Sequence, residues 1–160
     1  MIAIEPISLG IAMVLSAAFV FPIYNHSRKN KLAQQKKLNV LKEIGAKEGY
    51  NWDTIEYWRN EYLIALDKNK KVLAYSQTSA TEPVLLNLKN YPLISMSEIS
   101  VPKENGGQRI DALYLRLQGN GTRSKEILLE FYHADKFSDL NGELPLVKKW
   151  ESICKETAKS

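Results

Sequence analysis

The chain of 160 residues contains one cysteine and two histidines, and this scarcity narrows the chemistry that it can perform. A single thiol, Cys154, excludes an intrachain disulfide and fits a reducing compartment. The histidines, His26 and His133, lie far apart in the sequence, and no spacing points to a metal site or a Cys-His dyad. We therefore expect Cys154 to be packed and unreactive, and we expect no metal or cofactor.

Recognisable catalytic motifs are missing as well. The chain has no phosphate-binding P-loop, no Gly-x-Ser-x-Gly elbow and no dinucleotide-binding glycine pattern, and the Gly-Asn-Gly at 119–121 reads as a turn. The carboxylates are scattered over polar positions, so no pair stands out for acid–base catalysis. These absences predict a protein that is not an enzyme.

Charge is absent from residues 7–24 (ISLGIAMVLSAAFVFPIY). At about 1.5 Å rise per residue, a helix of this length measures roughly 27 Å, which suffices for a hydrocarbon core of about 30 Å. Residues 1–24 are therefore expected to form a transmembrane anchor. A cleaved signal peptide stays open as an alternative because Ser16-Ala17-Ala18 suits cleavage, although residues 1–6 lack a basic residue. A buried core helix is the other alternative.

Basic residues follow this segment and none precedes it. The positive-inside rule then places the carboxy-terminal part in the cytoplasm and the amino terminus outside, in a single-pass protein of the cell inner membrane. The same cations are candidate contacts for anionic lipid head groups. They are Arg28, Lys29, Lys31, Lys36 and Lys37. Alternatively, these charges serve topology and solubility alone.

The net charge of +4 does not indicate a nucleic-acid surface. The excess of positive charge lies in residues 25–49, whereas Lys and Arg balance Asp and Glu over residues 50–160. A neutral globular part lacks the basic footprint that nucleic-acid binding requires. We expect no nucleic-acid partner.

Residues 25–49 are rich in good helix formers and predict a basic helical stalk that ends near Gly45 or Gly49. Its apolar stripe includes Leu38 and Leu41 and is too short to establish a coiled coil, so self-pairing of the stalk stays open.

Residues 50–160 predict one domain built mainly of antiparallel strands. An aromatic cluster at its start either packs the first strand against the core or lines a ligand groove; it comprises Tyr50, Trp52, Tyr57, Trp58 and Tyr62. Residues 62–67 and 72–75 flank a polar turn and predict a hairpin in which alternate residues from Tyr62 share one face.

Further strands are expected over residues 84–88 and 93–101, with a turn at 106–107. Residues 113–118 and 127–131 alternate apolar and polar side chains around a Gly-containing turn and predict a second hairpin. Arg116 and Glu130 would then form a cross-strand ion pair on its outer face.

The chain ends in a predicted amphipathic helix. Its apolar positions recur at helical spacing, with Trp150 at the centre of the apolar face. The expected members of that face are Leu146, Val147, Trp150, Ile153, Cys154 and Thr157. Such a helix must cover an apolar opening of the strands.

This order resembles bacterial membrane proteins that carry a pleckstrin-homology-like (PH-like) domain. The residues that carry the resemblance are Trp58 to Asp67, Lys71-Val72-Leu73, the segment from Leu88 to Ile99, and Trp150 in the last helix. It implies an α+β fold: a transmembrane helix and stalk, then an antiparallel β-sandwich or partly open barrel closed by the carboxy-terminal helix.

The resemblance further implies an interaction or oligomerisation module. Phosphoinositide-binding members carry a Lys-x-n-Arg phosphate clamp, with a variable number of residues between the two cations, across the first two strands. Here Ala74 and Tyr75 occupy the second strand, so the clamp is missing. Two functions are therefore expected in this order: a module that binds a protein or a second copy, and a module that senses anionic lipid with its juxtamembrane cations and the lysines of the turn at 68–71.

Overall fold

The structure is a computed structural model that describes residues 31–77, 82–103, 106–120 and 125–160. The predicted membrane span, residues 7–24, lies outside these ranges, as do Arg28 and Lys29. Within the described ranges, no helix combines the length and the apolar character needed to cross a bilayer.

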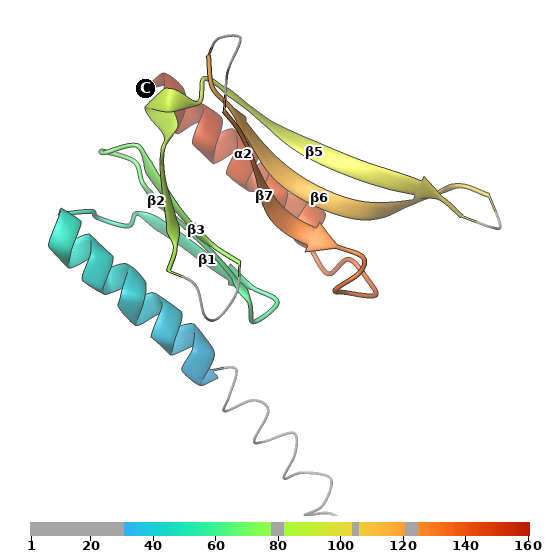
Figure 1. Cartoon of the computed structure of the whole chain (residues 1–160), viewed down its shortest axis with the longest axis horizontal. Helices are drawn as coiled ribbons and strands as arrows, with labels where there is room; N and C mark the ends of the chain where they lie inside the picture. The colour runs from blue at the N-terminus through green and yellow to red at the C-terminus, as the bar shows by residue number, and fades with distance from the viewer. Residues whose placement is uncertain (1–30, 78–81, 104–105, 121–124) are drawn as a thin grey trace, which may run out of the picture.

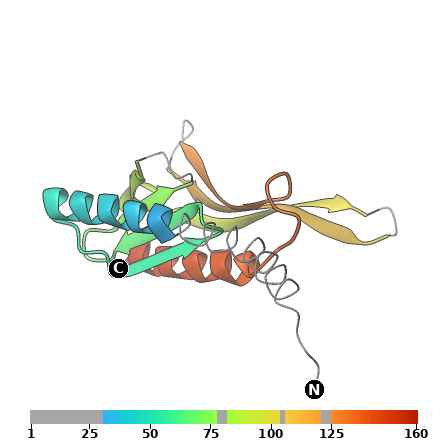
Figure 2. The same cartoon turned by 90° about the horizontal axis from the view of Figure 1, so that it is seen from below.

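The described part of the first helix covers residues 31–48, and it confirms the helix expected there. Gly45, expected as one possible end, lies inside the helix instead. The chain leaves the helix at Gly49, whose φ of +70° is in the left-handed region that glycine adopts most readily. The helix lies alongside the first sheet (Figures 1 and 2), and Leu41 is fully buried there.

The first sheet has four antiparallel strands in sequential order, β1 to β4. Their bounds are Thr54–Trp58, Tyr62–Asp67, Val72–Ser76 and Val84–Asn87. The predicted hairpin is β2–β3, and its register pairs Leu66 with Leu73. A short 3-10 helix, η1 (Leu88–Asn90), then leads to the second sheet, and the Asn87 side chain accepts a hydrogen bond from the Lys89 N–H at 3.0 Å.

Strand β1 was not predicted from the sequence. It is joined to β2 by a tight turn in which Arg59 and Asn60 have φ of 52° and 59°. Two consecutive left-handed residues are typical of a type I′ hairpin turn, which usually contains glycine. Because neither residue is glycine, the sequence carries no obvious hairpin signal at this point.

The second sheet has three antiparallel strands, β5 (Leu93–Pro102), β6 (Gln108–Gln118) and β7 (Glu126–His133). The predicted alternation is confirmed, since Leu113, Leu115 and Leu117 are all fully buried. β7 pairs with β6 only from Ala112 to Gln118, whereas β5 pairs with β6 down to Gln108. The far end of the β5–β6 hairpin therefore projects beyond β7 (Figure 1).

The last helix, α2 (Glu143–Lys159), packs against the second sheet. Val147, Trp150 and Cys154 are fully buried, which confirms the expected apolar face with Trp150 at its centre. They join β2, β3, η1 and all three strands of the second sheet in one core. The fold is thus α+β: a first helix, two antiparallel sheets of four and three strands, and a carboxy-terminal helix.

A smaller apolar cluster lies on the opposite face of the first sheet. Leu41 packs there against Leu63, Ala65 and Ala74, with Leu38, Trp52 and Tyr57 at the margin. The Trp52 indole N–H donates a hydrogen bond to the Leu41 carbonyl at 2.9 Å. A Cβ at Gly45 would lie 2.9 Å from Trp52 Nε1, so glycine is needed for this close approach.

We expect Gly45→Ala to destabilise the protein. Alanine improves helix propensity by about 1 kcal/mol, but overpacking costs about 1–3 kcal/mol, and here the added Cβ also meets the Tyr50 carbonyl at 3.0 Å. A net loss of about 1 kcal/mol should appear in urea unfolding of the full chain, followed by tryptophan fluorescence. Asn39→Ala, at an exposed position of the same helix, is the control. Equal or greater stability of Gly45→Ala would contradict this packing.

Candidate functional site

The rare reactive side chains do not form a centre in the part of the chain described. Cys154 is fully buried, and burial raises the pKa of its thiol to about 12, which keeps it protonated. His133 accepts a hydrogen bond from the Asp135 N–H at 3.2 Å through its own Nδ1. No three His, Cys, Asp or Glu residues among those described are placed to hold a metal ion.

A polar network joins the two sheets at Glu130. Its carboxylate accepts hydrogen bonds from Tyr62 Oη at 2.5 Å, Gln77 Nε2 at 2.9 Å and Lys136 Nζ at 2.6 Å. Its backbone carbonyl accepts a further bond from Tyr75 Oη at 2.6 Å. Burial, followed by the Glu130 charge, raises the pKa of both tyrosines, so their hydroxyls remain donors.

The predicted ion pair between Arg116 and Glu130 is wrong. Arg116 lies opposite Leu128 and forms its ion pair with Glu126 at 2.7 Å. Glu130 lies opposite Tyr114, and its carboxylate accepts hydrogen bonds from Tyr62 of β2, from Gln77 just after β3 and from Lys136 after β7. The cross-strand pairing of one hairpin does not show that side chains from elsewhere in the chain bind the Glu130 carboxylate in place of Arg116.

The network also protects a sheet edge. β7 is an outer strand, and side chains from the first sheet donate to its backbone carbonyls: Tyr75 to Glu130, and the Trp58 indole to Phe131 at 3.0 Å. The Trp58 ring is stacked on Phe131 with centroids 4.8 Å apart. These contacts engage two backbone carbonyls of β7, which makes this part of the edge less available to another strand.

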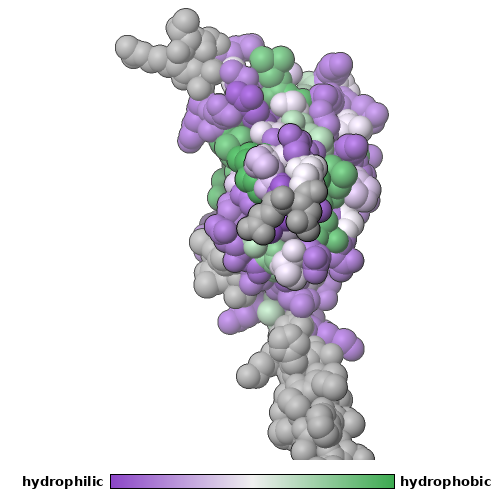
Figure 3. Space-filling view, turned by 90° about the vertical axis from the view of Figure 1, so that its right-hand side faces the viewer, coloured by the Kyte–Doolittle hydropathy of each residue, from purple (hydrophilic) through white to green (hydrophobic). Residues whose placement is uncertain are grey.

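The edge of β5 has no such cover. β5 pairs with β6 on one side, and among the described residues no side chain donates to or accepts from its backbone on the other. Ten residues of strand span about 33 Å, and Glu98 is the one charged residue among them. Leu93 and Ile99 on this strand are 60% and 49% exposed. Seen from the side toward which the hairpin points, apolar patches lie among polar surface (Figure 3).

The predicted lipid-contacting cations occupy different environments. Lys31 and Lys36 are exposed on the first helix, whereas Lys37 is buried, with 7% of its surface accessible. Lys37 Nζ donates to the Glu61 carbonyl in the β1–β2 turn and lies 5.9 Å from the centroid of the Tyr57 ring. Lys37 is therefore engaged by the domain itself, and Arg28 and Lys29 lie outside the described residues.

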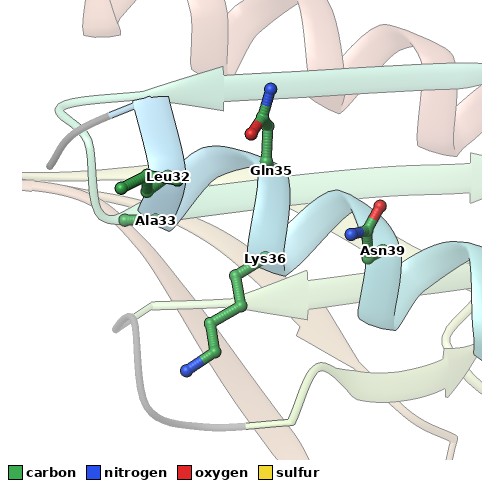
Figure 4. A pocket seen from close by; sticks show the side chains of 5 residues that line it. All are labelled: Leu32, Ala33, Gln35, Lys36 and Asn39. Carbon is green, nitrogen blue, oxygen red and sulfur yellow. The ribbon is translucent and has the colours of Figure 1, made fainter. Parts of the chain in front are cut away.

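A shallow hollow of about 450 Å³ runs along the first helix. Its walls are Leu32, Ala33, Gln35, Lys36 and Asn39, which all come from this one helix (Figure 4). Gln35 and Lys36 point away from each other in this view. A hollow with one cationic group and no converging partner from a second described element offers surface contact rather than an enclosed binding site.

Comparison of the chain with protein-family models, with curated proteins and with solved structures finds no match.

The environment of Lys37 predicts an unusual dependence of stability on pH. Burial lowers the pKa of Lys37 from 10.5 to about 8, and the neighbouring Glu61 carboxylate opposes this only in part. Because the folded-state pKa lies below the unfolded value, the unfolded chain binds more protons between these values, so this contribution to stability grows as the pH rises from about 8 to 10. Burial, and then the Glu61 charge, raises the pKa of the nearby Tyr57 hydroxyl.

Urea unfolding of the wild type and of Lys37→Met at pH 7 to 10 tests this expectation. The wild type should gain about 1–2 kcal/mol relative to the variant over this range. Lys36→Met, which removes an exposed ammonium from the same helix, should keep the wild-type profile. Parallel profiles for the wild type and Lys37→Met would show that Lys37 titrates normally.

Proposed function

We propose that this chain is a non-enzymatic, single-pass membrane protein that presents its folded domain at the cytoplasmic face as an interaction or oligomerisation module. The uncharged segment 7–24, followed and not preceded by basic residues, supports the anchor and its orientation. The observation that carries the interaction role is the uncovered edge of β5.

We also propose that the domain is PH-like. Four strands and then three in two antiparallel sheets, with the carboxy-terminal helix packed on the second sheet, agree with the resemblance that the sequence carries. On this proposal Trp150 fills the space under the second sheet, where it is fully buried in the main core. The role follows from the surface rather than from the fold, because one fold can support many functions.

Strand addition is the contact that β5 suits best. An extended segment that pairs with this edge gains backbone hydrogen bonds, while pockets for alternate side chains supply specificity. The other outer strands are less available: β7 is covered by Trp58 and Tyr75, and β4 has four residues. On β1, Glu56 forms an ion pair with Lys149 of α2. The partner is thus an extended segment of another protein or of a second copy.

Ile99→Lys should weaken this contact by tenfold or more, since a lysine on an edge strand opposes pairing with another strand. The measurement places a photo-crosslinking amino acid at Ser95 of the full chain in native membranes and quantifies the captured product, which mass spectrometry then identifies. Leu128→Lys is the matched control: Leu128 is 50% exposed against 49% for Ile99, but it lies on the covered strand β7.

A second probe position, Ser152 on the exposed side of α2, reports background capture. Equal capture from Ser95 and Ser152, or equal loss with both lysine variants, would contradict strand addition at β5. Alkaline extraction of the same membranes tests the anchor, because release of the chain into the soluble fraction would contradict a spanning segment at 7–24.

An alternative function, sensing of anionic lipid, is favoured by the exposure of Lys31 and Lys36 on the helix that follows the predicted span. Each cation near an anionic surface contributes about 1 kcal/mol, and salt screens the attraction over about 10 Å. Lys68, Lys70 and Lys71 of the β2–β3 turn were the other candidates. Lys70 Nζ instead donates to the Glu48 carbonyl at 2.9 Å and lies 5.0 Å from the centroid of the Tyr50 ring.

Lipid sensing predicts a difference between two double variants of the full chain in nanodiscs that contain anionic lipid. Lys31→Gln/Lys36→Gln should lower the anionic lipid retained at low salt several-fold, as measured by native mass spectrometry. Lys42→Gln/Lys47→Gln removes two exposed charges farther along the same helix and should have little effect. Equal retention by both double variants would rule out this role for Lys31 and Lys36.

A further inference from the structure

The β1–β2 turn carries backbone strain that its surroundings must hold in place. Arg59 and Asn60 both have positive φ, at 52° and 59°. A side chain with a Cβ disfavours this region by roughly 1–2 kcal/mol per residue, although asparagine tolerates it better than most. Such a conformation persists where neighbouring contacts over-determine it.

One set of contacts comes from the first helix and from β1. Lys37 Nζ donates to the Glu61 carbonyl at the end of the turn, and Tyr57 Oη donates to the Asn60 carbonyl. The Lys37 ammonium also lies 5.9 Å from the centroid of the Tyr57 ring. The buried Lys37 side chain thus joins the helix to the backbone of the turn.

The other set comes from the amino end of α2 and from the segment just before it. Arg59 Nε pairs with the Glu143 carboxylate, and Arg59 Nη2 donates to the Asp139 carbonyl at 2.5 Å. The guanidinium carbon lies 4.8 Å from the centroid of the Phe137 ring. The side chain of Glu143 is 3% exposed, so this ion pair is well shielded on the carboxylate side.

The charge on Glu143 is kept by these contacts. Burial alone would raise the pKa of its carboxyl, but hydrogen bonds from Arg59 and from the N–H groups of Asn141 and of Glu143 itself outweigh burial, and the pKa is lowered. Because the Glu143 side chain is buried, movement of Arg59 away from it would leave its charge uncompensated. A shift of the turn would therefore disturb the contacts at the start of α2.

We propose that the β1–β2 turn is a coupling element through which docking of the helix at residues 31–48 and ordering of the amino end of α2 stabilise each other. Two elements at opposite ends of the described chain hold one strained backbone, the helix through Lys37 and α2 through Arg59. Coupling of this kind is reciprocal, so a loss on either side weakens the other.

Hydrogen exchange of the full chain in nanodiscs tests the coupling in both directions. Lys37→Met, which keeps most of the side chain's bulk, should raise exchange in residues 137–147 about fivefold. Arg59→Gln should raise exchange in residues 34–46 by a similar factor. Lys36→Met and Arg109→Gln remove exposed cations from the first helix and from β6, and they should leave the two segments unchanged.

The proposal would be overturned if each substitution raised exchange only on its own side of the turn. It would also be overturned if the loss of unfolding free energy in Lys37→Met/Arg59→Gln equalled the sum of the losses in the two single variants. If Arg59→Gln does not fold, Arg59→Lys retains the charge while losing the forked donor geometry. It should still raise exchange in residues 34–46, and no change there would overturn the proposal as well.

Discussion

The rest of the fold depends on β2 being buried on both of its faces. Every residue of Tyr62–Asp67 is buried, as is every residue of its partner Val72–Ser76. A two-sided strand pair needs two covers, because each face carries apolar side chains that water would otherwise contact. The second sheet and α2 cover the face of Ile64, and the first helix covers the face of Leu63.

The two covers are built from residues of different size. On the main-core side, large side chains from both sheets surround Trp150. On the helix side, Ala65 and Ala74 lie beneath Leu41, and Gly45 lets Trp52 approach the helix backbone. Small residues allow a helix to lie close to a sheet, so this interface depends on shape as much as on buried area. It also brings Lys37 within reach of the β1–β2 turn.

The sequence predicted the elements whose signal is local. The β2–β3 and β6–β7 hairpins and the apolar face of α2 follow from alternation or helical spacing, and the structure confirms them. The sequence did not predict that residues 31–48 pack on the first sheet. The short apolar stripe around Leu41 indicates that one side of the helix is covered, but it does not indicate by which element. The unbroken apolar run in β2 was the signal of two-sided burial.

Local sequence patterns could not predict contacts between segments that lie far apart in the chain. Glu130 receives donors from three separate parts of the chain, so a pairing rule applied to one hairpin assigned it the wrong partner. The candidate site shows the same division. The sequence predicted a strand at residues 93–101, but it did not show that this strand lies at the edge of its sheet. That follows from the pairing of β6 with both β5 and β7, and side chains of the first sheet contact the backbone of β7 at the opposite edge.

The docked helix changes what an anchor at residues 7–24 would mean for the domain. A free helical stalk of 18 residues would be about 27 Å long, so it would hold a domain at that distance from the start of the stalk and let the domain rotate. Here Leu41 and Lys37 fasten the helix along the side of the first sheet, so the helix adds no such reach. The described part of the helix therefore has a fixed place on the first sheet, so the direction of the β5 edge is fixed relative to this helix.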